Sequence, residues 1–536
     1  MKSPLELTFE VLANSRNESA NEVLLTAFQW ENGPLFIESL KTILARRNKE
    51  AHTAVLQRWH ELGEPERQLI LKSHSRISGA LRDAILSEDS LLFTNACQVV
   101  EHIEDYDLVP NLVALSEHTT SPHAKEAAAL VLRLTERLSA LLKKTKKQNE
   151  TRDPRVYRKS VLECLKRSLE RYRYHKRPEL LEAFSQICES NDEFLLTILD
   201  DPHHPCFKDM SHAFASSANS AVIDLLLKML QGEKVPATIL SIVSYRTDRK
   251  FICRMLEYCD QAKSTPLSRS LKRLRSLSWL NVPSNRLSTF CEADQVLCVH
   301  MLSASGVSPD AVLDSLEELL LAGEPAGRAA ACEALAEFPG DHTNHLILQA
   351  VYDTSPPVQA AATRQLRDRH IPGTMPLLSD LLDGPHEEVR NAAREALAEF
   401  SFENFVKNYD NLSEEARQTT GSFVQRVDEE YLALLKNELS AQGVKPRLRA
   451  IEIAQLLEVV PFVVDDLLTL LTDNDHVVRA AAAEALKYWP VPEVQAALEI
   501  AALDRSGTVQ NAARNSLAVF GSFEQPTSPD LVEARQ

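Results

Sequence analysis

The sequence predicts an all-α protein built as an α-solenoid of stacked helical hairpins, regular in its C-terminal part and irregular in its N-terminal half. Three observations lead to this fold class. An apolar pattern with the period of a helix recurs every 31 residues in the last two fifths of the chain. The 536 residues contain only 14 glycines, and alternating Val-rich or aromatic runs bounded by turn dipeptides are nearly absent. The chain is also too long for one compact core unless it is a repeat array.

The repeat is clearest in residues 375–400 and 465–489. In both segments a leucine-rich helix ends at a turn that carries aspartate, and the next helix begins with the pattern V-R-x-x-A-x-x-A-L. The arginine of this pattern serves as the anchor for aligning the units. The anchors, including two weaker ones in the middle, are Arg328, Gln359, Arg390, Arg417, Arg447, Arg479 and Gln510. They define seven two-helix units.

Each unit carries one apolar stripe on each helix. In the first helix, leucines lie 12, 9 and 8 residues before the anchor, as at Leu378, Leu381 and Leu382. In the second helix the stripe is rich in alanine, and small side chains let neighbouring helices approach closely. A two-helix unit of this length cannot bury both stripes alone, so successive units must stack.

The segment from residue 308 to residue 520 resembles HEAT-type repeats of the short variety, about 30 residues long, that is also found in phycobilin lyases. The motifs that carry the resemblance are VRNAAREAL at 389–397 and VRAAAAEAL at 478–486. The resemblance implies a HEAT-like or armadillo-like superhelix whose second helices line a concave surface. It does not imply a reaction, because such repeats mostly serve as scaffolds. Enzymes of similar build, such as bilin lyases and DNA glycosylases, remain an alternative.

The remaining sequence is less regular, and we expect five regions. Residues 1–140 are predicted to form divergent helical-hairpin repeats, and residues 141–178 a basic linker followed by an amphipathic helix. Residues 179–307 are predicted to be helical without a clear repeat. Residues 308–520 hold the HEAT-like repeats, and residues 521–536 are predicted to be a disordered tail.

Acidity is concentrated in the repeats. Residues 1–300 contain 41 Lys and Arg against 39 Asp and Glu, whereas residues 301–536 contain 18 against 37. Five glutamates recur at two fixed positions of the second helix, and we call them the glutamate row: Glu333, Glu337, Glu395, Glu399 and Glu484. Stacking would align them on a concave, acidic surface suited to a basic or extended protein partner. The alternative is a solvated face that only keeps the repeats soluble.

The opposite charge gathers in residues 141–177, where 14 basic residues face four acidic ones. From residue 155 onward the pattern is that of an amphipathic helix. Its candidate anion-binding residues are Arg155, Arg158, Lys159, Lys166, Arg167 and Arg171. This segment could bind nucleic acid or an anionic membrane peripherally, could contact the acidic repeats of the same chain, or could be simply solvated.

The sequence contains no catalytic constellation that spacing can support, and we predict a non-catalytic scaffold without cofactor or metal. Nine cysteines are scattered and never form CxxC, so we expect buried thiols rather than disulfides or zinc sites. His203, His204 and Cys206 are the densest group of potential metal ligands, but a proline-broken loop between helices explains them equally well. The turn aspartates and helix arginines of the repeats are expected to pair and to support the stack.

The predicted location is the cytoplasm. The N-terminus lacks the basic start, apolar run and cleavage site of a secretory signal, and no stretch reaches the ~20 apolar residues of a membrane-spanning helix. Partner identity and oligomeric state do not follow from the sequence.

Overall fold

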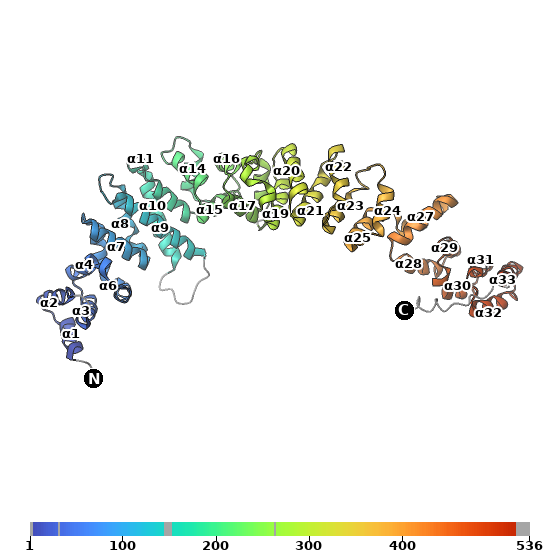
Figure 1. The fold of residues 1–536 in the computed structure, drawn as a ribbon, viewed down its shortest axis with the longest axis horizontal. Helices are drawn as coiled ribbons and strands as arrows, with labels where there is room; N and C mark the ends of the chain where they lie inside the picture. The colour runs from blue at the N-terminus through green and yellow to red at the C-terminus, as the bar shows by residue number, and fades with distance from the viewer. Residues whose placement is uncertain (1–3, 31–32, 144–152, 262–263, 521–536) are drawn as a thin grey trace. The chain divides into compact units, whose positions relative to one another are not determined.

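The computed structural model of the chain is all-α, as predicted (Figure 1). It describes residues 4–30, 33–143, 153–261 and 264–520, and no β-strand occurs in these ranges. The predicted tail at 521–536 and most of the predicted basic linker lie outside the described residues. Contacts divide the chain into two compact units, Met1–Glu318 and Leu319–Gln536, called unit 1 and unit 2 below.

The helices of unit 1 follow one another with short connections. They are α1 Pro4–Asn14, α2 Ser19–Phe28, α3 Pro34–Ala45, α4 Lys49–Gln57, α5 Glu64–Lys72, α6 His74–Ile85, α7 Ser90–Ile103, α8 Val109–Glu117, α9 Ala124–Lys143, α10 Pro154–Glu170, α11 Tyr172–His175, α12 Pro178–Ile187, α13 Glu193–Asp200, α14 Phe207–Ser216, α15 Ser220–Met229, α16 Ala237–Tyr245, α17 Arg249–Gln261, α18 Thr265–Arg273 and α19 Glu292–Ala304. Single 3-10 turns are η1 Trp59–Glu61, η2 Tyr106–Leu108, η3 Ser278–Asn281, η4 Pro283–Asn285 and η5 Leu287–Thr289.

Helix α20 contains the boundary between the two units, and the rest of the described chain belongs to unit 2. The helices are α20 Pro309–Ala322, α21 Pro325–Ala334, α22 Asp341–Ala350, α23 Pro356–Gln365, α24 Thr374–Leu382, α25 Glu387–Ala396, α26 Phe402–Asn408, α27 Glu414–Val427, α28 Tyr431–Leu439, α29 Val444–Leu456, α30 Val464–Leu470, α31 His476–Ala485, α32 Pro492–Ala501 and α33 Gly507–Phe520. The 3-10 turns are η6 Leu335–Glu337, η7 Ala398–Phe400, η8 Tyr409–Asn411, η9 Val460–Phe462 and η10 Leu486–Tyr488.

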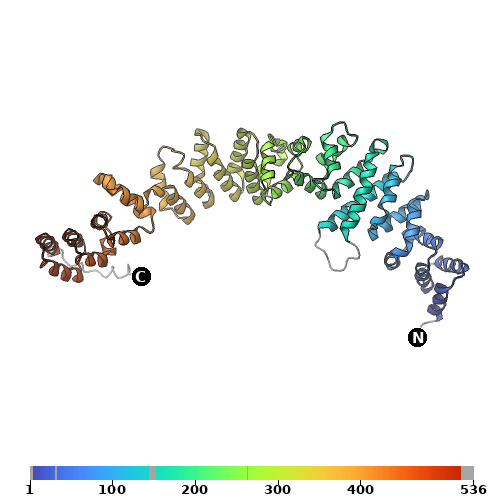
Figure 2. The same cartoon turned by 180° about the vertical axis from the view of Figure 1, so that it is seen from behind.

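Unit 1 is built of helix pairs from α8/α9 onward. The first helices α8, α10, α14 and α16 lie in one layer, and the second helices α9, α12, α15 and α17 lie in the other (Figures 1 and 2). Side chains of Asp153, Asp192 and Asn219 accept hydrogen bonds from backbone N–H groups and so begin α10, α13 and α15. The arrangement of helices in pairs therefore continues through residues 179–307, where the sequence shows no clear repeat.

Irregular backbone in unit 1 is concentrated between α18 and α19. Three short 3-10 turns, η3 to η5, replace a continuous helix there. Trp279 is fully buried in this segment, and Asn285 donates to the carbonyl oxygen of Thr247 at 2.7 Å. The ring of Phe290 contacts the guanidinium of Arg249, whose carbon lies 4.1 Å from the ring centroid. The segment is thus held by buried side chains although it lacks helical periodicity.

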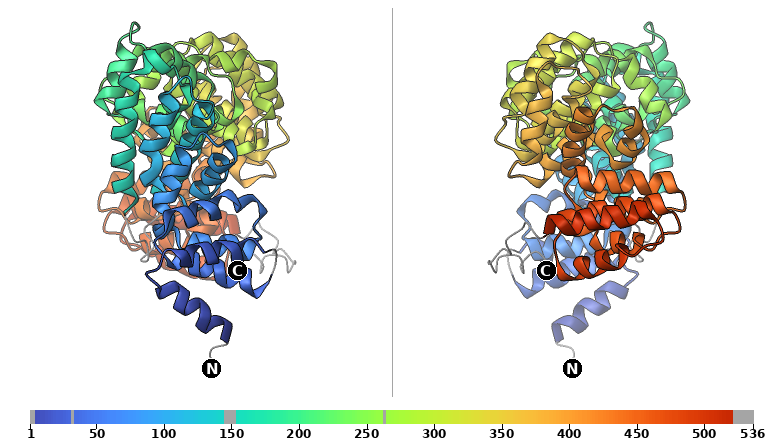
Figure 3. Two further views of the ribbon diagram at one scale, coloured as in Figure 1. Left: turned by 90° about the vertical axis from the view of Figure 1, so that its left-hand side faces the viewer. Right: turned by 90° about the vertical axis from the view of Figure 1, so that its right-hand side faces the viewer.

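Unit 2 contains the predicted two-helix units, and their second helices stack on one another. Helices α21, α23 and α25 form one run of contacts, and α29, α31 and α33 form another. Alanines on the facing sides are buried, as at Ala361, Ala392 and Ala482. Because these side chains end at Cβ, the helix axes can approach closely. The right-hand view of Figure 3 shows the last second helices, in orange to red, lying nearly parallel, one above the other.

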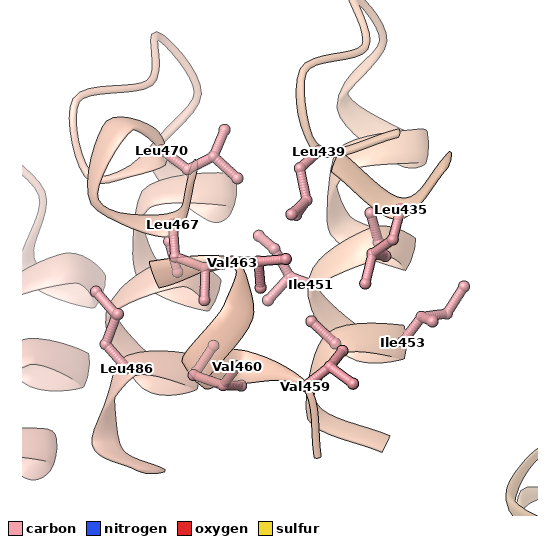
Figure 4. Close-up of a cluster of buried hydrophobic side chains, with 14 of the residues drawn as sticks. Leu435, Leu439, Ile451, Ile453, Val459, Val460, Val463, Leu467, Leu470 and Leu486 are labelled. Atoms are coloured by element: carbon pink, nitrogen blue, oxygen red, sulfur yellow. The ribbon is translucent and has the colours of Figure 1, made fainter. Parts of the chain in front are cut away.

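The leucines of the first helices fill the space beneath this stack. Figure 4 shows Leu435 of α28 and Leu467 of α30 converging on Ile451 of α29 and on Val463. The cluster extends without interruption from Phe402 to Ala513. Each first helix thus packs on the second helix of its own unit, as in the pairs α28/α29, α30/α31 and α32/α33, and side chains of successive units meet in one core.

The regular stack is interrupted between α25 and α27. Polar contacts cross this step: Arg394 pairs with Glu429 at 2.7 Å, and Arg426 pairs with Asp383 at 2.6 Å. The rings of Phe400 and Phe423 stack with centroids 5.0 Å apart. This is the stretch in which the sequence repeat is weakest, because α27 has Ala416 and Thr420 where the clearest units have the Val and the Ala of the V-R-x-x-A pattern.

Gly306 permits the closest backbone approach in unit 1. It donates its N–H to the carbonyl oxygen of Leu271 at 3.1 Å, and a Cβ on this residue would lie 2.1 Å from the carbonyl oxygen of Lys272. That atom belongs to the backbone of α18 and cannot rotate away. Residue 306 must therefore be glycine for the end of α18 to pack on the loop after α19.

We predict that Gly306→Ala destabilises the α18–α19 region by about 1–3 kcal/mol, because overpacking against a fixed carbonyl forces a backbone shift. Faster hydrogen exchange of α18 and α19 amides would show it. The matched control is Gly79→Ala in α6, where a new Cβ meets nothing within 4 Å and alanine favours the helix. Equal exchange in the Gly306→Ala variant and the wild type would contradict the packing account.

Candidate protein-interaction surfaces

The glutamate row lies on the second helices of unit 2, or on the 3-10 turns that end them, with its side chains in solvent. Glu333 and Glu337 belong to α21 and η6, Glu395 and Glu399 to α25 and η7, and Glu484 to α31. All five are exposed. The structure thus places them as the repeat spacing predicts, on one layer of the unit.

Arginines of α23 and of the turn after it are interleaved with this row. The Nε atom of Arg364 donates to Glu395 at 2.6 Å, and the Nη2 atom of Arg367 donates to Glu399 at 2.5 Å. Arg364 occupies the same repeat position as Glu333 and Glu395, one unit away from each. Part of the row is therefore an alternating-charge ladder between units and not a purely acidic strip.

At the two repeat positions of the row, five and nine residues after the anchor, four exposed carboxylates have no ion-pair partner within the described chain. They are Glu333, Glu337, Asp368 and Glu452. Glu452 was not among the predicted site residues, although it stands five residues after Arg447, as Glu333 stands five after Arg328. Its unit is one of the two weak repeats, and only the anchor alignment could have identified it. Glu484 is close to Lys487, with 3.4 Å between Oε1 and Nζ.

A second row of charges ties successive units together through the turns. Arg328 makes two hydrogen bonds to Asp353, of 2.9 and 2.8 Å, and Arg479 makes two to Asp504, of 2.9 and 3.0 Å. Arg447 donates one hydrogen bond to Asp473, of 3.2 Å, and its Nε atom lies 3.0 Å from the other carboxylate oxygen. In each case the arginine belongs to one unit and the aspartate to the turn of the next. The predicted Asp–Arg pairing is confirmed, and it acts between units.

The same aspartates also shape their own turns. Asp353 accepts from the N–H of Ser355, and Asp504 accepts from the N–H of Ser506, both at 2.7 Å. Burial raises the pKa of Asp353, but the hydrogen bonds from Arg328 and from the Ser355 N–H outweigh it and leave the pKa below its usual value. The bonds from Arg479 and from the Ser506 N–H lower the pKa of Asp504.

This Asp–Arg ladder is missing at three successive units, and the sequence explains why. Gln359 replaces the anchor arginine in one unit, and its side chain donates to the carbonyl oxygen of Asp353. The aspartate of the next turn, Asp383, pairs with Arg426 instead. Arg390 donates to the carbonyl oxygen of Gly384 of its own turn. No aspartate stands 25 residues after Arg390, where the ladder needs one. In the unit of Arg417, the residue 25 positions further on is a glutamine, and Arg417 donates to the carbonyl oxygen of Tyr409 instead. The gap falls where the stack of second helices is interrupted.

The predicted basic helix is α10, a first helix of unit 1. Half of its candidate residues are engaged in ion pairs within the fold: Arg158 with Glu189 at 2.7 Å, Lys166 with Asp192 at 2.8 Å, and Arg171 with Glu117 at 2.7 Å. The other half, Arg155, Lys159 and Arg167, are exposed and have no ion-pair partner among the described residues. Glu163 and Glu170 share their exposed face.

The buried cysteines have unreactive thiols. Desolvation raises the pKa of the Cys97, Cys206 and Cys332 thiols to about 12, so these groups stay protonated and weakly nucleophilic at neutral pH. Cys291 differs because it is exposed. All nine cysteines are free thiols.

The histidine-rich loop before α14 is held by its own turn. His204 accepts at Nδ1 from the N–H of Cys206 at 3.2 Å, and the Cys206 thiol donates to the carbonyl oxygen of Leu169 at 3.5 Å. Asp209 accepts from the hydroxyl of Tyr172 at 2.6 Å. Within the described ranges, no three His, Cys, Asp or Glu side chains are grouped as metal ligands. Among the described helices, none combines the length and the apolar character needed to cross a bilayer.

Paired helices, alanine-rich second helices and charges that link one unit to the next define a helical-repeat protein of the α-solenoid class. The family model described as HEAT repeats matches residues 299–399, and the chain is a HEAT-like repeat protein. The matched segment ends where the regular stack is interrupted. This confirms the resemblance found in the sequence.

Two solved structures resemble this one at low sequence identity. The crystal structure of Kap121p is 13% identical, with a TM-score of 0.28, over 96% of this chain and 69% of that one. The structure of UNC-45 from Drosophila melanogaster is 13% identical, with a TM-score of 0.25, over 97% of this chain and 83% of that one. No curated protein sequence matches the chain.

We predict that Asp504→Asn weakens the contact between the last two units by about 1–2 kcal/mol, because the guanidinium of Arg479, whose side chain is only 4% exposed, loses its charged acceptor. Hydrogen exchange of α31 and α33 should accelerate. The matched control is Asp383→Asn, whose side chain is 74% exposed and whose loss should cost under about 0.5 kcal/mol. Similar effects of both changes would show that the ladder does not hold the units together.

The lowered pKa values also predict acid sensitivity of unit 2. A carboxylate whose pKa is lower in the folded state stabilises the fold above its unfolded pKa, near 4, and loses this contribution as pH falls through the folded pKa. We expect hydrogen-exchange protection of α23 and α33 to fall between about pH 5 and pH 3. The double variant Asp353→Asn, Asp504→Asn should have less protection at pH 7 and a flatter pH profile. An unchanged profile would contradict the assignment.

Proposed function

We propose that this chain is a non-catalytic scaffold that binds another protein through the second-helix layer of unit 2. The observation that carries the proposal is the set of exposed, unpartnered carboxylates on that layer, Glu333, Glu337, Asp368 and Glu452. The partner surface is basic, because a field of negative sign attracts cationic side chains and disfavours phosphate-bearing partners.

The separation of these residues along the stack defines the kind of partner. Glu333 and Glu337 stand on one unit, Asp368 on the next, and Glu452 three units further on. Second helices that pack about 8–10 Å apart spread such contacts over several tens of ångströms. An extended basic segment, or a helix with a basic face, would meet all of them at once. Affinity then comes from several weak contacts, and the charge pattern selects the partner.

Paired glutamates contribute less to this surface than the unpaired ones. Glu395 and Glu399 are already neutralised by Arg364 and Arg367, so a partner would have to displace an arginine to reach them. We therefore assign them to holding α23 and α25 in register and assign recognition to the free carboxylates. The basic helix α10 is not assigned a function, because ion pairs within the fold engage half of its candidate residues.

Nine free thiols support a reducing compartment for this scaffold, and we propose the cytoplasm.

The proposal predicts that the triple variant Glu333→Lys, Glu337→Lys, Glu452→Lys loses its main protein partner, with affinity falling about tenfold. Partners are captured from a lysate of the source cells and quantified by mass spectrometry. The dissociation constant of the purified partner is then measured at several salt concentrations. Wild-type binding should weaken as salt rises, and the variant should lose most of this salt dependence.

The matched control is the triple variant Glu403→Lys, Glu430→Lys, Glu493→Lys, which makes the same change in net charge at the first turns, or the cap, of first helices α26, α28 and α32. It should retain the partner. If both triple variants lose binding equally, net charge alone governs association. If neither does, the second-helix layer is not the docking surface, and the proposal fails.

A further inference from the structure

One edge of unit 1 is free of carboxylates over two successive first helices. Helix α16 carries no charged residue, and the chain contains no Asp or Glu between Asp260 and Glu292, a stretch that includes all of α18. The three carboxylates between Glu233 and Glu292 are Asp248, Glu257 and Asp260, which belong to α17 or to the turn that begins it. We call α18 and the residues that follow it to Arg275 the basic edge.

The cations of the basic edge point into solvent and are not neutralised by the fold. Arg269, Lys272, Arg273 and Arg275 are all exposed, and none has an ion-pair partner in the described part of the chain. Arg273 makes one long contact, 3.5 Å from Nη1 to the carbonyl oxygen of Val235. This differs from α10, where the fold itself supplies carboxylates to half of the candidate cations.

The helix that presents these cations is firmly positioned. Ser264 caps its N-terminus by accepting from the N–H of Leu267, and Ser270 donates to the carbonyl oxygen of Leu230 at 2.7 Å. At the other end the backbone of Leu271 and Lys272 rests against Gly306. A preorganised row of cations loses little entropy on binding, so it binds more strongly than a flexible one.

A hollow of about 470 Å³ lies beside α18, between it, α19 and the end of α17. Leu267 and Leu271 of α18 line it together with Leu297, Met301 and Ala304 of α19. Its lining also includes the side chains of Ser268 and His300 and one carboxylate, Asp260. Lys272 stands four residues after Ser268 and hence on the same strip of the helix. Apolar space and unpaired positive charge are therefore adjacent.

We propose that the basic edge docks an acidic segment of another protein, with an apolar side chain of that segment in the hollow. Charge complementarity supports the acidic character, and the hollow supports a polypeptide over other polyanions. Proteins that bind single-stranded nucleic acid stack its bases on aromatic side chains, and the residues that line this hollow include no Phe, Tyr or Trp. A membrane-binding helix shows apolar side chains beside its cations, whereas the exposed face of α18 carries only Thr265, Ser268, Arg269, Lys272 and Arg273.

This surface is independent of the second-helix layer of unit 2, and the two select partners of opposite charge. The protein would thus be a scaffold with two kinds of docking surface. If the second-helix layer proves not to bind a partner, the proposal for the basic edge still stands, because different variants and different probes test each surface.

The test uses the full-length chain and a fluorescent synthetic peptide of glutamates around a central Leu-Phe pair. Fluorescence anisotropy should show binding that weakens with salt. The triple variant Arg269→Glu, Lys272→Glu, Arg275→Glu should bind about tenfold more weakly. The matched control Arg155→Glu, Lys159→Glu, Arg167→Glu makes the same change on α10 and should bind like the wild type. Arg269→Gln, Lys272→Gln, Arg275→Gln supplies a milder variant if the charge reversal impairs folding, which circular dichroism would reveal.

Two further arms test the hollow and the competing ligands. A peptide with Ser-Ser in place of Leu-Phe should bind more weakly to the wild type, and Ala304→Leu, which fills the hollow, should remove the difference. Single-stranded RNA and phosphatidylserine vesicles are tested in parallel. If the peptide fails to bind, or if the α10 variant loses as much affinity as the α18 variant, the proposal is overturned. It is also overturned if RNA or vesicles bind through the α18 cations and the peptide does not.

Discussion

The structure depends on the contact between alanine-lined faces of successive second helices. Ala361, Ala392 and Ala482 are buried where one second helix meets the next, and a larger side chain there would separate the helices. Once these helices are close, the leucines of the first helices have a surface to cover, and the turns of adjacent units come within reach of a single arginine. The hydrophobic core and the ladder of charges therefore both follow from the size of one residue type.

This constraint explains which features could be predicted from sequence. A repeat of about 31 residues places alanines on one face in most units, so the fold and the existence of Asp–Arg pairs follow from spacing, whereas only the structure shows that these pairs join neighbouring units. The partner chosen by Arg364 could not be predicted, because Glu333 and Glu395 stand one unit away on either side and only side-chain geometry decides between them. The helix pairs within residues 179–307 could not be predicted either, because the buried side chains there differ from pair to pair and leave no sequence repeat. The sequence also contains the carboxylate-free stretch around α18, but its Lys and Arg residues are less dense than those of residues 141–177, so the charge pattern alone does not single it out.

Charge is organised differently in the two helix layers. On the second helices of unit 2, arginines neutralise the central glutamates and leave free carboxylates on neighbouring units. On the first helices of unit 1, α10 is partly neutralised by the fold, whereas the cations of α18 are not. Net charge alone would assign one sign to each half of the chain. The ion pairs show instead which charges are used for stability and which remain available to a partner.

The same contacts determine where unit 2 is most deformable. A solenoid transmits rigidity only from neighbour to neighbour, so a weak step is not compensated by distant ones. At the step from α25 to α27 the alanine contact and the Asp–Arg ladder are missing together, and exposed pairs such as Arg394 with Glu429 take their place. Such exposed pairs contribute little to the free energy of unfolding, because water solvates both partners when they separate. Of the free carboxylates, Glu333, Glu337 and Asp368 lie before this step and Glu452 after it. Bending there would change the spacing between the two groups, so a partner that contacts both would also select the curvature of the repeats.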